Sequence, residues 1–393
     1  MRVVQINAVY EYGSTGRSTM EIHQTLIKMG EESCVFCTNF CDERQNVFMI
    51  GNKIDHKIHA FMSRLTGLQA YFSKVATKRL IEKLEKFKPE IIHLQNLHAN
   101  YINLSLLLRY LAKKDIATVV TLHDCWFFTG HCCHYTEDKC DKWLTGCGNC
   151  PALRKYNISW FFDRSKKIYK DKKQLFEAIP KLAVVGNSEW TTTQARKSLL
   201  KKAQIIEKIY NWINLDEFYP HIKGTNVKFT ILGVAQSWTE KKGLSVFVRI
   251  AEHYSDCRVV IIGKIEHDVK LPDNVLIVGI TNSIKELAKY YSIADVFVNT
   301  SIQETFGNVS AEALACGTPI VVNNATANPE LVEEGCGYVA DNNNIDSYFA
   351  AIDQVRYLGK ANYSEKCVQF ARNNFDMKNN INKYIMLYNR LLW

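Results

Sequence analysis

ADVFVNTSIQETFGNVSAEALACGTPIVV, residues 294–322, reads as a strand, a loop, a helix and a second strand. The apolar run 296–298 ends at polar Asn299, which is typical of a buried parallel strand. A helix is predicted from Asn308, a favoured N-cap residue, to the stop formed by Gly317 and Pro319. The order predicts an α/β fold of the doubly wound class, in which helices connect parallel strands.

Two carboxylates, Glu304 and Glu312, bracket the loop and the helix start. Between them, Phe306, Gly307 and Asn308 lie where backbone N–H groups open the helix, and such a terminus binds phosphate oxygens. A carboxylate suits sugar hydroxyls, such as those of a ribose, rather than the phosphate itself. The pattern therefore indicates a nucleotide whose phosphate carries a sugar. The alternative is a solvated Glu in a loop and another on a helix face.

This stretch resembles the E-x7-E signature of retaining glycosyltransferases of family 4. That family has the GT-B fold, in which two doubly wound Rossmann-like domains face each other across a cleft. The resemblance implies that Glu304 lies beside the donor sugar and that Glu312 holds the ribose. It also implies that the backbone of Phe306, Gly307 and Asn308 binds the diphosphate of the donor.

The length of 393 residues predicts two domains, because one core seldom grows that large. Residues 209–220 resemble the interdomain linker of the family, with Trp212 where glycine is usual. We therefore expect an N-terminal, acceptor-side domain over 1–210 with a Cys-rich insertion at 125–151. A nucleotide-sugar-binding domain is expected over 211–376, followed by a helix, 377–393, that crosses back to the first domain.

Positive charge is concentrated in the first half of the chain. Residues 1–210 hold 32 Lys and Arg against 20 Asp and Glu (net +12), whereas residues 211–393 hold 17 against 20 (net −3). A basic half suits an anionic lipid surface or an acidic acceptor, and a merely solvated surface is the alternative. No recognised nucleic-acid motif is present, so no nucleic-acid partner is expected.

The sequence lacks an apolar run of 18 residues, and its first residues read as a strand rather than a signal peptide. We therefore expect a cytoplasmic protein. Peripheral contact with an anionic inner membrane face is a further hypothesis. The apolar positions of 61–72 favour core packing, with a membrane-facing patch as the alternative; they are Phe61, Met62, Leu65, Leu68, Tyr71 and Phe72.

Two residues of the first domain are candidates for the site. Residues 3–6 predict a strand, residues 12–17 a glycine loop and residues from about 18 to 29 a helix, which is the usual start of a doubly wound domain. The resemblance implies that Gly16 faces the donor phosphates. His123 follows the predicted strand 117–122, at the strand end where ligands gather. The resemblance places it near the donor sugar, and a hydrogen-bonded structural histidine is the alternative.

Further candidates lie in the second domain. Lys242 begins a predicted helix and resembles the family lysine that pairs with the diphosphate. The family commonly has an arginine five residues earlier, where this chain has Ser237, so Lys241 is the candidate for a second positive charge. The loop Gly279 to Thr281 follows another strand and resembles the loop that meets the nucleotide base.

The segment 125–151 holds six of the 13 cysteines. Cys147 and Cys150 form a CxxC pair, the usual half of a zinc knuckle, and Cys140 with either Cys132 or Cys133 would complete four thiolates. His131 and His134 could each replace a cysteine. We predict a structural zinc, with free or redox-active thiols as the alternative. The insertion resembles one found in some bacterial members of the family, and the resemblance implies that catalysis itself needs no metal or other cofactor.

The predicted function is a retaining, hexosyltransferase-type transfer. A sugar would pass from a nucleoside-diphosphate sugar to a glycan or lipid-linked saccharide in cell-surface polysaccharide biosynthesis. Glu304 and His123 would orient the sugar, and Lys242 would stabilise the leaving diphosphate. One alternative is a GT-B sugar-nucleotide epimerase. Another is a non-enzymatic, zinc-bearing nucleic-acid-binding protein, which would leave the two glutamates and Lys242 unexplained.

Overall fold

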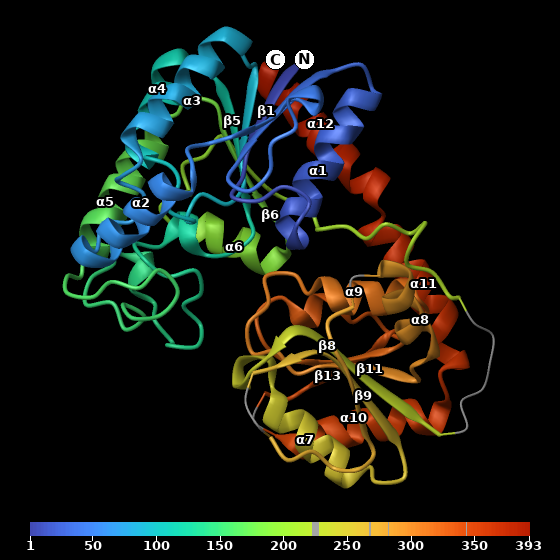
Figure 1. The fold of residues 1–393 in the computed structure, drawn as a ribbon. Coiled ribbons are helices and arrows are strands. Elements are labelled where there is room, and N and C mark those ends of the chain that lie inside the picture. The colour runs from blue at the N-terminus through green and yellow to red at the C-terminus, as the bar shows by residue number, and fades with distance from the viewer. Residues whose placement is uncertain (222–227, 267–268, 282, 343) are drawn as a thin grey trace. The chain divides into compact units, whose positions relative to one another are not determined.

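The computed structural model describes residues 1–221, 228–266, 269–281, 283–342 and 344–393 (Figure 1). The chain divides into two compact units. Unit 1 comprises Met1–Ile209 together with Ile381–Trp393, and unit 2 comprises Tyr210–Asn380. Each unit is a parallel sheet with its own hydrophobic core.

The sheet of unit 1 has, in the described residues, seven parallel strands in the order β3-β2-β1-β4-β5-β6-β7. The strands are β1 Arg2–Ile6, β2 Glu32–Cys37, β3 Val47–Met49, β4 Ile91–Leu94, β5 Ala117–Leu122, β6 Leu182–Gly186 and β7 Ile205–Lys208. The helices of this unit are α1 Gly13–Lys28, α2 Lys53–Thr66, α3 Lys74–Phe87, α4 Leu104–Lys114, α5 Ser165–Glu177 and α6 Glu189–Lys197. The strand order reverses between β1 and β4, and crevices for ligands form at such a point.

The sheet of unit 2 repeats this arrangement over its described part, in the order β10-β9-β8-β11-β12-β13. Its strands are β8 Thr230–Trp238, β9 Arg258–Ile265, β10 Val275–Val278, β11 Val296–Asn299, β12 Ile320–Asn323 and β13 Gly337–Ala340. Its helices are α7 Leu244–His253, α8 Ile284–Ile293, α9 Asn308–Ala315, α10 Ile345–Leu358 and α11 Ala361–Phe375. Two doubly wound parallel sheets confirm the predicted α/β class.

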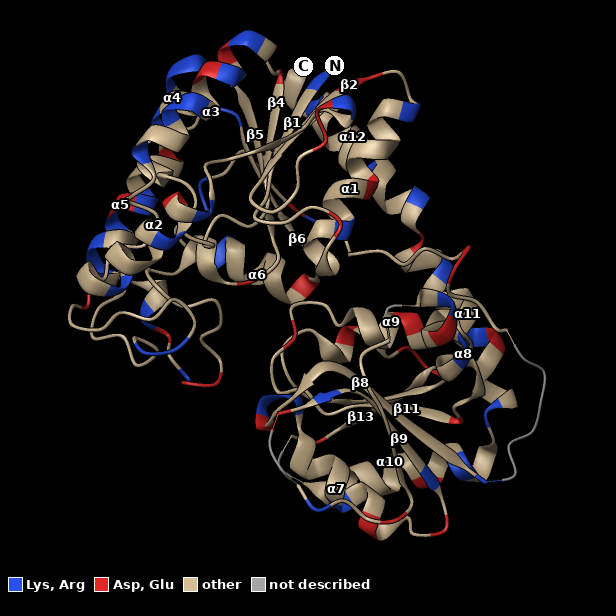
Figure 2. Cartoon of the chain, viewed as in Figure 1, with Lys and Arg blue, Asp and Glu red and all other residues tan. Residues whose placement is uncertain are grey.

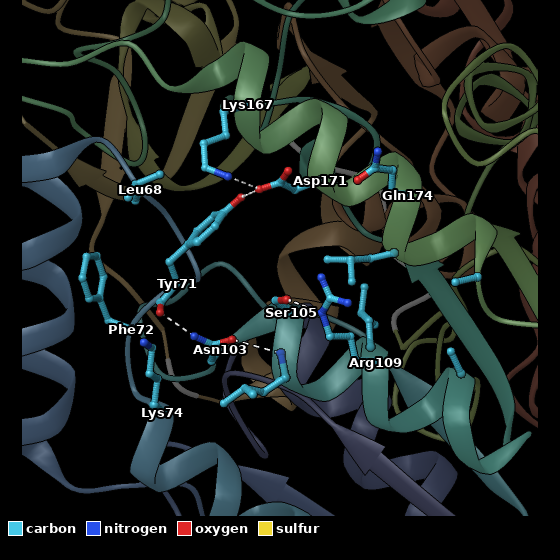
Figure 3. Close-up of a pocket in the computed structure, with 15 residues that line it drawn as sticks. Leu68, Tyr71, Phe72, Lys74, Asn103, Ser105, Arg109, Lys167, Asp171 and Gln174 are labelled. Atoms are coloured by element: carbon cyan, nitrogen blue, oxygen red, sulfur yellow. Dashed lines mark hydrogen bonds and ion pairs between the residues drawn. The ribbon is translucent and has the colours of Figure 1, made fainter.

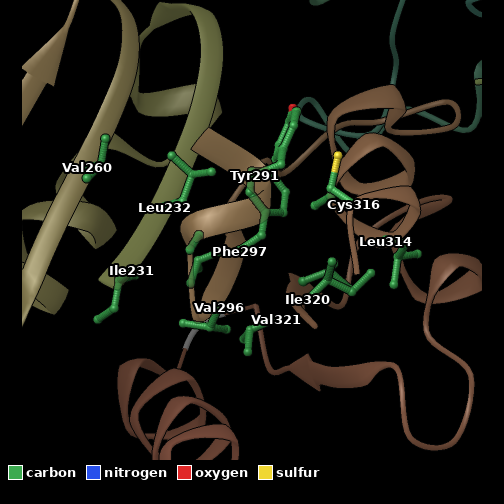
Figure 4. Close-up of a cluster of buried hydrophobic side chains, with 14 of the residues drawn as sticks. Ile231, Leu232, Val260, Tyr291, Val296, Phe297, Leu314, Cys316, Ile320 and Val321 are labelled. Carbon is green, nitrogen blue, oxygen red and sulfur yellow. The ribbon is translucent and has the colours of Figure 1, made fainter. Parts of the chain in front are cut away.

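The stretch that predicted the fold lies in the core of unit 2. Val296 and Phe297 of β11 and Ile320 of β12 are fully buried, and β11 pairs in parallel with both β8 and β12 (Figure 4). Because apolar side chains point to both faces of these strands, helices must cover the sheet on each side. This burial fixes the ends of β8 and β11, and the candidate site lies on the loops that follow them.

Helix α12, Met377–Leu392, begins in unit 2 and ends in unit 1. Its residues Tyr384 and Tyr388 are buried against the first sheet. The Tyr388 hydroxyl lies 2.8 Å from Nδ1 of His93 on β4, and the Tyr384 hydroxyl lies 2.9 Å from Thr121 on β5. The last residues of the chain thus complete the core of unit 1.

The insertion between β5 and α5 is a folded segment with two short 3-10 turns, Trp126–Phe128 and Lys142–Leu144. A buried lysine holds it to α5. Lys172 donates from Nζ to the carbonyls of Trp126 (2.5 Å) and Thr129 (3.0 Å) and lies over the Trp126 ring. Burial lowers the pKa of Lys172 to about 7. The segment is therefore tied to unit 1 by hydrogen bonds as well as by its aromatic side chains.

Two expectations about helices differ from the structure. Helix α1 begins at Gly13 rather than near residue 18, so Gly16 lies in its first turn. None of the six apolar residues of 61–72 is fully buried, and Phe61 is half exposed. The prediction of core packing for this stripe is therefore wrong at Phe61, because the buried face of α2 is formed by His59 and Ser63 instead.

Candidate active site

The candidate site of unit 2 lies where its strand order reverses. Lys242 closes the turn after β8, and Glu304 lies in the loop after β11; these two strands are neighbours in the sheet. All strands of the sheet are parallel, so both loops leave the same edge. Ligands of open α/β sheets bind outside this edge, at the reversal point. The topology therefore brings together two residues that are 62 positions apart in the chain.

Lys242 and Glu304 form an ion pair. Nζ of Lys242 lies 2.5 Å from Oε1 of Glu304, and the side chains are 38% and 17% exposed. Their loops are also joined through the backbone, because Thr300 donates from Oγ1 to the Lys242 carbonyl (2.6 Å) and the Ile302 amide donates to Lys241 (3.1 Å). Gly243 permits this close approach, since a Cβ there would lie 2.4 Å from the Thr300 side chain. The pair is therefore held in place by the backbone around it.

The start of α9 presents backbone rather than side chains. Gly307, with φ +99°, is the N-cap residue, so the helix begins one position earlier in its capping than expected from Asn308. The Phe306 side chain is buried against Tyr210 and Phe375. The Asn308 side chain accepts a hydrogen bond from Asn211 (3.2 Å). The side chains of Phe306 and Asn308 therefore pack within unit 2, and a phosphate at this helix start would meet main-chain N–H groups.

Glu312 is buried one turn into α9, and Oε2 accepts a hydrogen bond from the Tyr291 hydroxyl (2.8 Å). Tyr291 comes from α8 and is fully buried. Burial, followed by the charge of Glu312, raises the pKa of Tyr291 well above its usual value. The tyrosine therefore stays a donor at any physiological pH and fixes the orientation of the carboxylate. The sequence gave no signal for Tyr291 in this role.

The other candidates of unit 2 lie on the same edge of the sheet. Gly279 and Thr281 follow the edge strand β10; Gly279 is exposed, and a Cβ there would meet no atom within 4 Å. Thr281 donates to Glu286 (2.6 Å) at the start of α8. Lys241 lies partly exposed beside Lys242. Their roles towards a nucleotide stay predictions.

His123 follows β5 in unit 1, and a chain of amides holds it. Its Nε2 lies 3.0 Å from Oε1 of Gln95, and Gln95 in turn donates to Gln5 (2.7 Å). Burial lowers the pKa of His123 to about 4, so the ring is neutral at neutral pH. Because Gln95 presents its carbonyl oxygen, the proton of the ring lies on Nε2. Gln95 ends the neighbouring strand and was missed, since a single glutamine carries no sequence signal.

Gly16 has a structural reason to be glycine. Its amide donates to the Tyr12 carbonyl (3.1 Å), and its carbonyl accepts from the Glu11 amide (3.1 Å). A Cβ would lie 3.2 Å from both the Glu11 nitrogen and the Val9 side chain. The N–H of Gly16 is used inside unit 1, so the implied contact with donor phosphates stays a prediction that this geometry does not favour.

The two neighbouring cysteines of the insertion face different surroundings. Cys132 lines a cavity of about 20 Å³ together with Cys140, Cys147 and Cys150. Cys133 lies instead 3.8 Å from His98, which pairs with Asp124 (2.7 Å). Within the described ranges, this His98, Asp124 and Cys133 group is the one set of three ligand atoms found within 4.8 Å of one another. The choice between Cys132 and Cys133 that the sequence left open thus falls on Cys132 for the thiol cluster.

The cavity suits one small occupant, since a single water needs roughly 10–15 Å³. The Gly130 amide donates to the Cys147 sulfur (3.2 Å), and the Ala152 backbone bonds to Cys150, as N–H groups commonly do to metal-bound thiolates. Nε2 of His131, which is buried at the same cavity, has no hydrogen-bond partner in the structure. The thiols would have to turn inward to bind a metal. The residues present fit a zinc ion, which stays a prediction.

Comparison with known proteins identifies the family. A model described as "Glycosyltransferase Family 4" matches residues 15–217, and one described as "Glycosyl transferases group 1" matches residues 216–374. The chain belongs to Glycosyltransferase Family 4. This glycosyltransferase is 26% identical over 323 residues to "Uncharacterized 41.2 kDa protein in cps region" of Klebsiella pneumoniae, covering 79% of this chain and 81% of that one. Family membership favours an enzyme over the non-enzymatic nucleic-acid-binding alternative.

Two further relatives of the enzyme bear on fold and substrate class. It is 28% identical over 220 residues to the Escherichia coli "UDP-Gal:alpha-D-GlcNAc-diphosphoundecaprenol alpha-1,3-galactosyltransferase", covering 49% of this chain and 56% of that one. Its fold matches the structure titled "Anabaena Alr3699/HepE in complex with UDP-glucose", with a TM-score of 0.65 over 99% of this chain and all of that one. The sequence identity there is 14%, so this likeness shows the GT-B fold alone.

Proposed function

We propose that the enzyme transfers a hexose, with retention of anomeric configuration, from a nucleoside-diphosphate sugar to a glycan or lipid-linked saccharide. The observation that carries the proposal is the Lys242–Glu304 pair at the reversal point of the second sheet, next to the start of α9. A cation, a carboxylate and a helix N-terminus on one sheet edge suit the three parts of the donor. They would meet the diphosphate, the sugar hydroxyls and the phosphate oxygens, respectively.

Lys242 has the main electrostatic role in this proposal. The negative charge on the diphosphate grows as the bond to the sugar breaks, and a fixed cation beside it stabilises the transition state more than the ground state. Glu304 holds the ammonium in the free enzyme. With the donor bound, the ammonium lies between this carboxylate and the diphosphate, and the second oxygen of Glu304 can accept from a sugar hydroxyl.

Glu312 is proposed to hold the ribose. The Tyr291 hydroxyl uses one carboxylate oxygen, Oε2, and orients the other. A charged acceptor that is already oriented binds a diol without first losing side-chain freedom. In unit 1, the neutral ring of His123, fixed by Gln95, is proposed to orient the sugar.

Retention is proposed to follow from departure and attack on the same face of the sugar. The acceptor hydroxyl forms the new bond to the anomeric carbon, the bond to the diphosphate oxygen breaks, and that oxygen takes the hydroxyl proton. The product diphosphate keeps the bonding electrons, so charge and atoms balance. We assign the acceptor to cell-surface polysaccharide biosynthesis because relatives act there by name, and we infer that the enzyme works at the inner membrane face.

The proposal is tested with purified protein and a panel of UDP-, GDP- and ADP-sugars. We expect one donor to be hydrolysed slowly without acceptor, and the released or transferred sugar to keep the anomeric configuration of the donor when followed by proton NMR. Inversion would refute the retaining mechanism while leaving the donor site intact. Absence of binding to every nucleotide would refute the donor site itself.

A further inference from the structure

Helix α2 of unit 1 has its polarity reversed. Its two fully buried residues are His59 and Ser63, whereas Ile54, Ile58 and Phe61 are 68%, 58% and 52% exposed. These three residues follow helical spacing, so they lie on one face. A helix that belongs to a soluble surface normally buries such residues and exposes the polar ones. The exposed face of α2 is therefore built for contact with something other than water.

A second exposed apolar segment adjoins this face. Trp160, Phe161 and Phe162 are 42%, 68% and 49% exposed, and the ring centroid of Trp160 lies 5.9 Å from that of Phe61 on α2. The Trp160 amide donates to the Arg64 carbonyl at the end of α2 (2.8 Å). We call these six residues the aromatic face: Ile54, Ile58, Phe61, Trp160, Phe161 and Phe162. Large contiguous apolar patches of this kind mark interaction sites.

The aromatic face is held rigidly. Gly67 caps α2 with φ +72°, and a Cβ there would lie 2.2 Å from the Phe162 carbonyl oxygen. The Ser159 hydroxyl donates to the same carbonyl (2.8 Å). Because the loop packs on a glycine and closes on itself, its three aromatic rings are presented without ordering on contact. Such presentation lowers the entropic cost of binding.

Positive charge surrounds the aromatic face. Residues 53–66 and 160–171 together hold seven Lys and Arg against three Asp, and Figure 2 shows basic side chains along α2 and α5. The Arg164 guanidinium lies 5.2 Å from the Phe162 ring centroid. The three acids are used locally: Asp55 caps α2, Asp163 accepts from two amides, and Asp171 pairs with Lys167. The charge that faces outward is therefore basic.

A large hollow lies next to this face. It has a volume of about 920 Å³ and is bordered by α3, α4, α5 and the segment after α2 (Figure 3). Its walls are mainly apolar, with Leu68, Phe72 and Leu175 among them, and the basic residues Lys74, Arg109 and Lys167 line it as well. The Lys167 ammonium also lies 5.4 Å from the Tyr71 ring. Apolar walls with basic groups match an amphiphilic anion such as a lipid.

We propose that the aromatic face is a docking surface for an anionic lipid bilayer. Trp and Phe side chains enter the boundary between headgroups and acyl chains, and the basic rim meets lipid phosphates. Isoleucine side chains cannot stack on bases, so Ile54 and Ile58 favour lipid over nucleic acid. The proposal deepens the proposed function, on which it rests only for its purpose: it would hold the enzyme where lipid-linked acceptors lie.

The test is co-sedimentation of the purified enzyme with vesicles of phosphatidylcholine alone and with 30–40% phosphatidylglycerol, written here as an order-of-magnitude composition. We expect binding to the anionic vesicles that weakens in high salt, because surface charges are screened. Phe161→Ser with Ile58→Ser should reduce the partition coefficient about 10-fold or more, and Lys57→Glu with Arg164→Glu should remove the preference for anionic lipid.

Matched controls come from unit 2. Tyr357 is 85% exposed on α10, and Lys289 is exposed on α8. Tyr357→Ser and Lys289→Glu should leave vesicle binding unchanged. UDP binding and the circular dichroism spectrum should be unchanged in all variants, so a loss of lipid binding can be told from misfolding and from failure of the donor site. Equal vesicle binding by the aromatic-face variants and wild type would overturn the proposal, as would displacement of the vesicles by single-stranded RNA.

Discussion

Replacing Lys242 by alanine should reduce kcat about 100-fold or more while weakening nucleotide affinity less. The side chain reaches Glu304 at 2.5 Å, whereas the backbone of its loop is held separately through Thr300 and Ile302. The substitution therefore removes the cation and leaves the loop in place. Losing one preorganised charge-stabilising donor costs about 2.7–4 kcal/mol of transition-state free energy, which is 10²–10³ in rate.

The structure favours the upper part of this range. With Lys242 gone, the Glu304 carboxylate keeps its charge on the same sheet edge as the diphosphate and repels it. Lys242→Arg should recover only part of the activity, because the guanidinium fork is larger than the ammonium that Glu304 now holds. Lys241→Ala is the matched control, since it removes the same charge one residue away.

The assay is steady-state transfer, or donor hydrolysis, combined with calorimetric titration of the nucleotide. Wild-type kcat in the Lys242→Ala enzyme would show that the diphosphate does not lie at this helix start, and the donor site built from Lys242 and Glu304 would fail. A larger loss in Lys241→Ala than in Lys242→Ala would show that the two lysines have exchanged roles.

Glu312→Ala should weaken nucleotide binding by about 1.5–3 kcal/mol in calorimetry, because the ribose loses a charged acceptor; Tyr291→Phe should have a smaller effect, and unchanged affinity in both would remove the ribose assignment. The purified enzyme should contain about one zinc by elemental analysis, and Cys147→Ser with Cys150→Ser should lose the metal and lower the thermal stability of unit 1; metal-free wild-type protein, prepared without chelators, would favour the free-thiol alternative. Acid should destabilise unit 1: burial lowers the pKa of His93 to about 3, so below pH 6.5 the unfolded chain binds a proton that the folded chain does not, and the free energy of unfolding should fall by about 2 kcal/mol between pH 7 and pH 5 on account of this residue. His93→Gln should reduce that slope in urea titrations followed by tryptophan fluorescence, and an identical slope would contradict the assignment.

The sequence was sufficient where one strand order determines the outcome. Lys242 and Glu304 each follow an apolar run, and parallel strands deliver the ends of such runs to the same edge. Their pairing could therefore be expected once β8 and β11 were recognised as neighbours. The burial of Val296 and Phe297 likewise follows from their own residue types.

Other features depend on partners that are distant in the sequence. Gln95 fixes His123 from another strand, and a lone amide has no pattern that would reveal it. Cys132 and Cys133 are adjacent in the chain, yet the loop turns one towards three cysteines and the other towards His98. The apolar spacing of α2 was visible, but which face is covered depends on a loop about 100 residues later, so Phe61 was wrongly expected in the core.

The burial of Tyr384 and Tyr388 against β4 and β5 has a consequence for synthesis on the ribosome. Unit 1 contains the first residues to emerge, yet its core is closed by residues that emerge after all of unit 2. His93 and Thr121 therefore wait, without their partners, while some 170 residues are translated, which takes roughly 10–30 s at usual rates. A fragment ending at residue 209 would carry the same open seam permanently, so it should depend on chaperones in a way that the whole chain does not.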